Sequence, residues 1–340
     1  MTHAPTDVSP GSASEGRRKG SSFIDVRRVL TTRLKGAAPV TSAVPLELVS
    51  RATDDAPTLR NVEVLEHEAP RSLPVTGEST PRFAAFLDGA QWSMVLWAGG
   101  VPVVHGTVAA VIRQRHDRRM TTWHGPLLRR ALYAPVALLS PEWRDAIRDL
   151  DLEVVDTLEQ RAPDSGHPFA LQEIAYQSVL SAREAVEREL AEQWCKASSL
   201  ELYVDGALAG SKQMARSEQL VGVVKSHQRL YTASEHLPAL LQLARGERSS
   251  VVRVADSKRS AVASWYLRLR DAAGHDPFWG LVRVEVALSG KPDAATLTRR
   301  ADEVSRWILA EVLPLSVPDA RWDKMVYGIR DCEEYLRAIQ

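Results

Sequence analysis

Two apolar, β-forming segments of this chain end in the same way. Residues 83–88 and residues 200–205 each finish on an aspartate, Asp88 and Asp205, that is followed at once by glycine. Glycine allows a sharp turn directly after a strand, so the preceding carboxylate is free to point into a cleft. Two such carboxylates favour a site for a hard divalent cation, which prefers oxygen ligands. Asp-Gly is also a common turn dipeptide, and a turn alone explains either copy.

The rest of the chain alternates between strand and helix patterns. Two antiparallel strands around a Gly-Gly turn explain the uncharged stretch 94–112 better than a membrane span does. Strands are expected over 83–88, 92–98, 101–112, 200–204, 220–224, 249–254, 262–269 and 279–288, and helices over 126–139, 141–150, 171–194 and 294–312. This order predicts one compact α/β domain that resembles a ribonuclease-H-like layout, a mixed sheet flanked by helices.

The first 80 residues differ in composition from the rest. Residues 1–21 are rich in Ser, Gly, Pro and Thr and are expected to be a disordered tail. Residues 22–80 are expected to form an N-terminal arm, in which an amphipathic helix over 23–34 serves as a docking element. The folded domain is then expected over 81–340.

Charge and cysteine content limit the functional classes. The 43 basic and 43 acidic residues cancel, so any contact with nucleic acid must be local or shared with a partner. The two cysteines, Cys195 and Cys332, form no CxxC pair, which fits a reducing cytoplasm and excludes a disulfide framework. No segment predicts a transmembrane helix, and a cytoplasmic location is expected.

Three further segments follow the second Asp-Gly strand in a characteristic order: Val221–His227, Ser264–Leu269 and Trp279–Glu285. With this order the chain resembles the NurA family of nucleases, the partners of HerA-type hexameric ATPases. In that family a first Asp-Gly strand, a helical Glu, a second Asp-Gly strand and a Gly-x-x-Lys segment occur in series. The resemblance covers roughly residues 80–337.

The resemblance implies a ribonuclease-H-like fold and metal-dependent DNA cleavage with Mn²⁺ or Mg²⁺. It carries Asp88 and Asp205 over as metal ligands, and Lys225 as an active-site lysine that holds the scissile phosphate. Two divalent ions about 4 Å apart can activate water and stabilise the leaving oxygen of a phosphodiester. The alternative for Lys225 is a surface lysine.

The helical glutamate has four candidates, because Glu184, Glu187, Glu189 and Glu192 lie on one predicted helix. Glu187, eighteen positions before Asp205, fits the register that the resemblance implies and ranks first. On a helical wheel Glu189 falls within the apolar stripe, where a carboxylate without a metal would be costly, so it ranks second. The alternative is that all four are solvated helix charges.

Three later residues are candidates for substrate binding. His227 lies two positions after Lys225 and would share its strand face if the strand continues. Arg268 and Arg283 lie in apolar strands. The alternative for Arg283 is a strand-face pair with Glu285, two residues later.

The C-terminal segment departs from the family pattern. Asp319 lies where the family places late polar site residues and is a candidate additional carboxylate. A Tyr-Pro and Ala-His pattern of archaeal members is replaced here by residues 322–328, and both Asp-Gly motifs continue with Ala. The retained carboxylates favour an active nuclease. The alternatives are a catalytically weak DNA-end-binding adaptor and a nucleotidyl-transfer or RNA-cleaving relative of the fold.

The resemblance also implies a homodimer that caps a HerA-like hexameric ATPase, in DNA repair or phage defence. Because the net charge is zero, DNA binding is expected to need enclosure in a channel with local basic faces such as Arg113, Arg115, Arg118 and Arg119. The sequence contains no Walker A segment, so ATP-driven movement must come from the partner.

Overall fold

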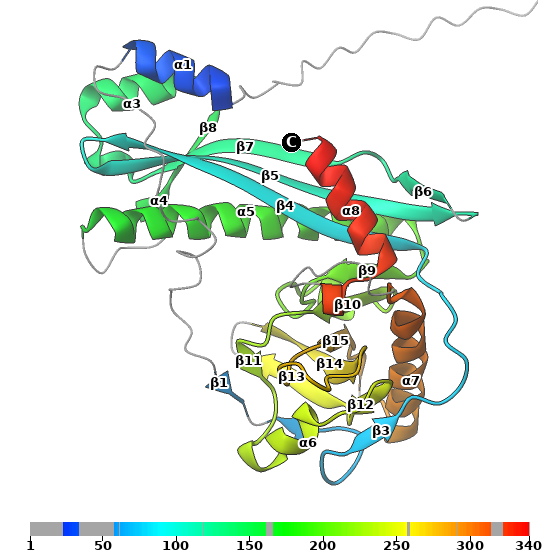
Figure 1. Ribbon diagram of the computed structural model, residues 1–340. Coiled ribbons are helices and arrows are strands. Elements are labelled where there is room, and N and C mark those ends of the chain that lie inside the picture. Colours follow the sequence, from blue (N-terminus) through cyan, green and yellow to red (C-terminus); the bar gives the residue numbers. More distant parts are fainter. Residues whose placement is uncertain are drawn as a thin grey trace, which may run out of the picture.

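The computed structural model describes residues 23–33, 58–60, 62–117, 119–160, 166–256, 259–290, 292–313 and 322–339 (Figure 1). Its helices are α1 (Phe23–Arg33), α3 (Pro141–Arg148), α4 (Thr157–Gln160), α5 (Pro168–Ala197), α6 (Leu237–Leu241), α7 (Ala294–Glu311) and α8 (Tyr327–Ala338), with short 3₁₀ turns η1 (Val136–Leu138), η2 (Met214–Arg216), η3 (Ser234–His236) and η4 (Trp322–Lys324).

The strands are β1 (Thr58–Leu59), β2 (Glu63–Val64), β3 (Ser72–Pro74), β4 (Ala85–Ala98), β5 (Val101–His116), β6 (Arg119–Thr122), β7 (Leu127–Ala134), β8 (Glu153–Asp156), β9 (Leu202–Asp205), β10 (Leu220–Val224), β11 (Arg229–Leu230), β12 (Glu247–Ser249), β13 (Val252–Asp256), β14 (Arg259–Arg268) and β15 (Leu281–Ala287). β1 and β11 form a small parallel pair, and the other strands join one large mixed sheet.

The centre of the large sheet has the strand order β7-β5-β4-β9-β10. β4 and β5 are antiparallel and meet at a turn in which Gly99 and Gly100 have positive φ, as the sequence predicts. β7 pairs antiparallel with β5, whereas β9 runs parallel to β4 and β10 parallel to β9. Three antiparallel strands, a long helix and a strand parallel to the first form the expected layout. The predicted mixed α/β sheet flanked by helices is confirmed.

The helix expected over 126–139 is wrong, because residues 127–134 form strand β7 between β5 and β8. Ala131 and Tyr133 pack into the core beneath α5, while Leu132 and Ala134 pack into the core beneath α1 and α3. Because both faces of this strand are covered, its end is apolar at every position and lacks the alternation typical of a half-exposed strand.

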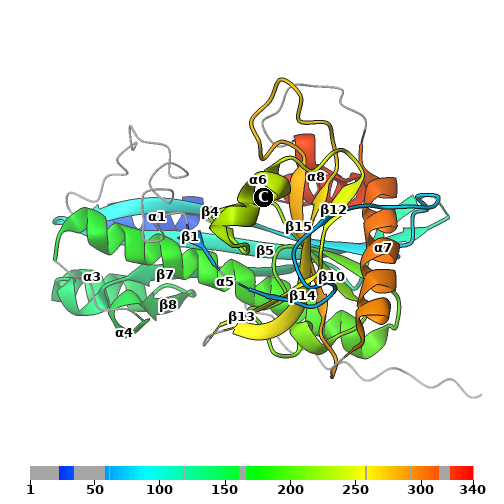
Figure 2. The same ribbon diagram turned by 90° about the horizontal axis from the view of Figure 1, so that it is seen from below.

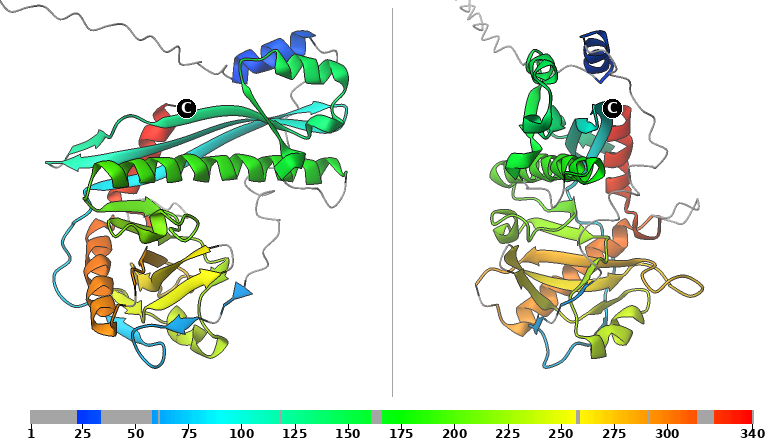
Figure 3. Two further views of the ribbon diagram at one scale, coloured as in Figure 1. Left: turned by 180° about the vertical axis from the view of Figure 1, so that it is seen from behind. Right: turned by 90° about the vertical axis from the view of Figure 1, so that its left-hand side faces the viewer.

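Helices cover both faces of the sheet (Figure 3). α5 lies along the β4–β5 hairpin (Figure 2). It contributes Val186, Leu190 and Trp194 to one core with Leu87. α7 and α8 contribute to a second core on the opposite face, which contains Phe86. Successive residues of β4 therefore point to different cores, so Asp88 shares the α8 face with Phe86.

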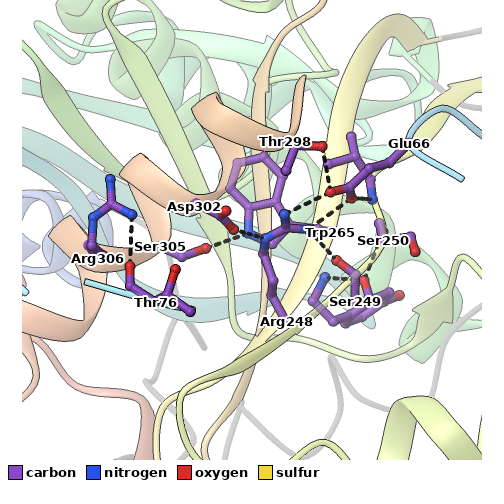
Figure 4. Close-up of polar contacts among 12 residues, drawn as sticks. Glu66, Thr76, Arg248, Ser249, Ser250, Trp265, Thr298, Asp302, Ser305 and Arg306 are labelled. Carbon is purple, nitrogen blue, oxygen red and sulfur yellow. Dashed lines mark hydrogen bonds and ion pairs between the residues drawn. The ribbon is translucent and has the colours of Figure 1, made fainter. Parts of the chain in front are cut away.

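The described part of the predicted N-terminal arm is built into the fold. β2 pairs with β13 and β3 with β12, and Glu66 between them lies in a buried polar network (Figure 4). Arg248 donates to both oxygens of Glu66 over 2.8 and 2.9 Å, and its Nε lies 2.6 Å from Asp302 on α7. Burial alone would raise the pKa of Glu66, but these hydrogen bonds and that of the Val251 N–H lower it.

We expect Glu66→Ala to lower the free energy of unfolding by about 3 kcal/mol, because it leaves a buried guanidinium without one of its partners. Urea denaturation measures this loss. The matched control is Glu63→Ala, since Glu63 pairs with Arg253 at 3.4 Å where both side chains are exposed, and it should cost less than about 1 kcal/mol. Equal losses for the two variants would contradict the assignment of Glu66 as a structural anchor.

The apolar face of α1 is used within the chain. Val26 and Leu30 are fully buried in a cluster with Leu96, Trp143 and Ile147 at the far end of the hairpin. The expectation that these two side chains dock a partner is therefore wrong, because packing on α3 and the hairpin already removes them from water. Residues 1–22 and 34–57 lie outside the described residues. Among the described helices, none is both long and apolar enough to cross a membrane.

Candidate functional site

The two sequence-predicted aspartates adjoin on neighbouring parallel strands. The register pairs Phe86 with Tyr203 and Leu87 with Val204, so the next positions along the two strands are Asp88 and Asp205. Residues in register on parallel strands point to the same face, and both carboxylates therefore lie on the α8 side of the sheet. β9 ends at Asp205 while β4 continues, so the pair lies where the two strands separate.

The two glycines that follow these aspartates have different structural roles. Gly206 has φ +149° and its N–H donates to the carbonyls of Val204 and Val223, so the chain turns away from the sheet there. Gly89 lies inside β4, and the expected strand end at Asp88 is wrong. A Cβ at position 89 would lie 2.7 Å from Cδ of Glu187 and closer still to its Oε1. Glycine at this position therefore lets the Glu187 carboxylate lie over the strand backbone.

Of the two ranked glutamates, Glu187 is the one whose charge reaches Asp88, and it approaches Gly89 from the α5 side of the sheet. The Glu189 side chain is 39% exposed and pairs with Arg129 on β7. The helical-wheel argument for Glu189 is wrong because the buried stripe of α5 turns along the helix. Its apolar residues recur every four positions (Leu171, Ala175 and Val179, then Val186, Leu190 and Trp194), and each such step shifts the buried face by about 40°.

The three carboxylates influence one another in apolar surroundings. Burial raises the pKa of Asp88 well above its usual value, Asp205 and Glu187 raise it further, and Lys225 opposes them. Burial also raises the pKa of Glu187 to about 7, with Arg183 lowering it and Asp205 and Glu184 raising it. Charged carboxylates at these positions are thus unfavourable unless a cation compensates them.

Lys225 supplies one such cation. It follows β10, in which Val223 pairs with Asp205, so by the alternation of a strand it lies on the same face. Its Nζ donates to Oδ2 of Asp205 over 2.7 Å. Burial would lower the pKa of Lys225, but Asp205 and Asp88 raise it, so the side chain is an ammonium at neutral pH.

The donor chemistry of this cluster suits a hard divalent cation. Asp88, Glu187 and Asp205 offer only oxygen ligands. The buried Oε1 of Glu187 accepts no hydrogen bond from the described residues, and Nε of Arg183 lies 3.5 Å from it. In the described chain, no group of three or more His, Cys, Asp or Glu side chains is already arranged to hold an ion. The ammonium of Lys225 neutralises part of the charge in this arrangement.

We compared the chain with known proteins. No family model matches it, and no curated protein does. Among solved structures it is similar to the NurA nuclease from Sulfolobus solfataricus, with 11% identity and a TM-score of 0.40 over 82% of this chain and 85% of that chain. Function is therefore inferred below from the geometry of the site.

The structure does not bring Arg268 to the carboxylates. Its side chain is fully buried, and its guanidinium donates to backbone carbonyls of the surrounding loops, namely those of Leu241, Leu243, Pro277 and Trp279. A guanidinium whose donors are used in this way stabilises loop backbone. We assign Arg268 a structural role in place of the predicted substrate contact.

Arg283 forms the strand-face pair that was its alternative. Its guanidinium pairs with Glu285 and lies 4.7 Å from the centroid of the Tyr231 ring. Glu285 also accepts hydrogen bonds from the N–H groups of Leu208 and Ala209, over 2.7 and 3.2 Å. The pair therefore fixes the loop that follows Asp205, which positions the site without touching a substrate.

His227 packs beside the site as a neutral ring. Its Nε2 lies 2.8 Å from the carbonyl of Leu281, and the ring stacks on Phe278. Burial, together with the charges of Lys324 and Arg283, lowers the pKa of His227 to about 4. The imidazole carries no charge at neutral pH to attract a phosphate. Asp319 lies outside the described residues.

Two of the predicted basic residues are already paired. Arg113 pairs with Asp331 on α8, and Arg115 makes a bidentate pair of 2.8 and 2.7 Å with Glu311 on α7. These arginines hold α7 and α8 onto β5, so they do not form the free basic face that was expected. Arg118 lies outside the described residues.

Two residues near the site were missed by sequence reasoning. Glu333 on α8 contributes to the raised pKa of Lys225, and Lys324 donates to the backbone carbonyl of Lys225 over 3.3 Å. About a hundred residues separate them from Lys225, and no motif spacing links them. Only the return of α8 across β4 brings them close.

Glu187 gives the metal-free protein a specific pH dependence. Because its folded-state pKa is raised to about 7, the stability that its protonated form contributes is present below pH 4.5 and is lost as the pH rises to 7. Between pH 4.5 and pH 7 in EDTA, the free energy of unfolding should fall by about 3 kcal/mol less in Glu187→Gln than in wild type. Glu189→Gln, on the exposed side of the same helix, should leave the decline unchanged. The same pH dependence in wild type and Glu187→Gln would contradict the burial of this carboxyl group.

Proposed function

We propose that this protein is a metal-dependent deoxyribonuclease, a hydrolase of phosphodiester bonds. The observation that carries the proposal is the meeting of Asp88 and Asp205 at adjoining register positions, with Glu187 over Gly89 between strand and helix. Asp88, Glu187 and Asp205 would hold Mn²⁺ or Mg²⁺. Such an ion, when bound, supplies an activated water and stabilises the charge on the leaving oxygen.

The other residues of the cluster have roles that follow from their chemistry. Lys225 is an ammonium 2.7 Å from Asp205, and it would hold the scissile phosphate once the carboxylates are neutralised. Glu187 is close to half-protonated at neutral pH, so it can give up a proton when a cation arrives. The pairing of Arg283 with Glu285 keeps the loop after Asp205 in place.

The second candidate is a DNA-end-binding adaptor with weak catalysis. It is favoured by the direct pairing of Lys225 with Asp205, together with the lack of a ready-made ion-binding group among the described residues. The two candidates differ in a cleavage assay on linear DNA. The nuclease degrades end-labelled DNA in Mn²⁺ and is inactive in EDTA, whereas the adaptor retards the DNA in a gel and leaves it intact in both.

The sequence resemblance supports three further parts of the proposal: a homodimer, a HerA-like hexameric ATPase as partner, and a cytoplasmic role in DNA repair or phage defence. Light scattering and a pull-down with a HerA-like ATPase test the first two. A variant that lacks residues 1–22 and keeps α1 is compared in the same pull-down, because Val26 and Leu30 of α1 are core residues. A monomer in solution, or no association with the ATPase, would contradict these parts without affecting the nuclease proposal.

A further inference from the structure

A second lysine lies beside the carboxylate cluster. Lys324 is the last residue of η4, directly before α8, and its side chain is 16% exposed. Its Nζ donates to the carbonyl oxygen of Lys225 over 3.3 Å. The two ammonium groups are close enough that the charge of Lys225 lowers the pKa of Lys324.

The carboxylates near Lys324 accept hydrogen bonds from backbone N–H groups. Its ion pair within the described part of the chain is with Asp323 at 4.0 Å, which is too long for a hydrogen bond. Asp323 accepts from the N–H of Gly280 over 2.7 Å, and the exposed Asp276 accepts from the N–H of Phe278 over 2.8 Å. Both carboxylates thus stabilise the 270–280 loop, and the Asp323 carboxylate lies beyond hydrogen-bond distance of the ammonium.

Burial is the main cause of the lowered pKa of Lys324: Asp323 and Asp276 raise this pKa, and Arg268 and Lys225 lower it by smaller amounts. The charge of Lys324 in turn lowers the pKa of His227. A mostly buried ammonium, beside Lys225 and with no hydrogen-bonded carboxylate among the described residues, is an arrangement that an anion would stabilise.

We propose that Lys324 binds a backbone phosphate of the nucleic-acid strand, adjacent to the scissile phosphate held by Lys225. The proposal rests on the proposed function and adds a substrate-binding residue to it. The contact is independent of base sequence, because the ammonium binds the charged phosphate and not the edge of a base. Its anchor to the Lys225 carbonyl fixes the spacing between the two phosphate contacts.

The test is the binding of a short labelled DNA to the full chain in EDTA, where cleavage does not interfere, at several salt concentrations. Lys324→Ala should weaken binding roughly tenfold and reduce the slope of log K against log salt by about 0.7–0.9, the loss of one phosphate contact. Lys324→Arg should restore most of the affinity. Lys212→Ala, which removes an exposed lysine, should change neither quantity.

Affinity and salt slope that are unchanged in Lys324→Ala would overturn the proposal, and so would an equal effect of Lys212→Ala. Lys324→Met removes the charge and keeps the apolar stem of the side chain. If the melting temperature falls in Lys324→Ala but not in Lys324→Met, the alanine variant has lost packing. The proposal then requires Lys324→Met to bind DNA more weakly than wild type. If wild type cleaves DNA and Asp88→Asn does not, the nuclease proposal survives a failure at Lys324. Lack of any DNA binding by wild type would overturn both.

Discussion

Asp88→Asn is expected to reduce Mn²⁺-dependent cleavage at least about 100-fold, because losing several kcal/mol of stabilisation by a bound ion corresponds to such a factor. The same change should leave the melting temperature of the metal-free protein equal or higher. Asp88 is buried beside two other carboxylates that raise its pKa, and asparagine removes the charge at nearly constant volume. The Oδ1 that accepts the Gly89 N–H over 2.8 Å is retained.

Cleavage of end-labelled linear DNA and thermal unfolding in EDTA measure the two effects. Asp149→Asn is the matched control, since Asp149 directly follows α3 and pairs with Arg33 of α1 where both side chains are exposed. It should leave cleavage unchanged. Near wild-type cleavage by Asp88→Asn in saturating Mn²⁺ would refute the placement of the active site.

Gly89→Ala is expected to lower cleavage nearly as much as removal of the Glu187 carboxylate, with little change in stability. The added methyl group would lie 2.7 Å from Cδ of Glu187, so this side chain must swing away from Asp88. The displaced group is the far end of a flexible side chain, and the backbone of Gly89 is ordinary strand. The cost therefore falls on the geometry of the site and not on the fold.

A double variant separates this mechanism from general damage to β4. If Gly89→Ala acts through Glu187, its effect should vanish when Glu187 is already alanine, because the two changes are not independent. Gly210→Ala is the control, since a Cβ there meets nothing within 4 Å. Additive losses from Gly89→Ala and Glu187→Ala would show that the methyl group disturbs something other than this carboxylate.

The elements that carry a clear local signal were predictable from the sequence. The Gly-Gly turn predicted the β4–β5 hairpin, and the apolar stripe predicted α5. Both signals come from residues that are close together in the sequence. β7 was not predictable in this way. Its pattern is set by two covering layers that come from distant parts of the chain, α5 on one face and α1 with α3 on the other.

The candidate site was likewise predictable only in part. The two Asp-Gly signals identified Asp88 and Asp205 as a pair, although the sequence could not show that Gly89 makes room for Glu187 and does not end a strand. The burial of Arg268 among four carbonyls and the nearness of Lys324 depend on loop and helix packing. Such long-range contacts leave no periodic or spacing signal in a single sequence.

In the proposed metal site Asp88, Glu187 and Asp205 would hold the ion, and burial favours the protonated forms of Glu187 and Asp88 when no ion is bound. Because the pKa of Glu187 is about 7 and that of Asp88 is raised well above its usual value, cation binding near neutral pH must release protons. Calorimetric titration with Mn²⁺ in buffers of different ionisation enthalpy measures this release. We expect wild type to bind Mn²⁺ with net proton release that falls in Glu187→Gln and in Asp88→Asn. Binding without proton release, or with the same release in all three proteins, would contradict this account.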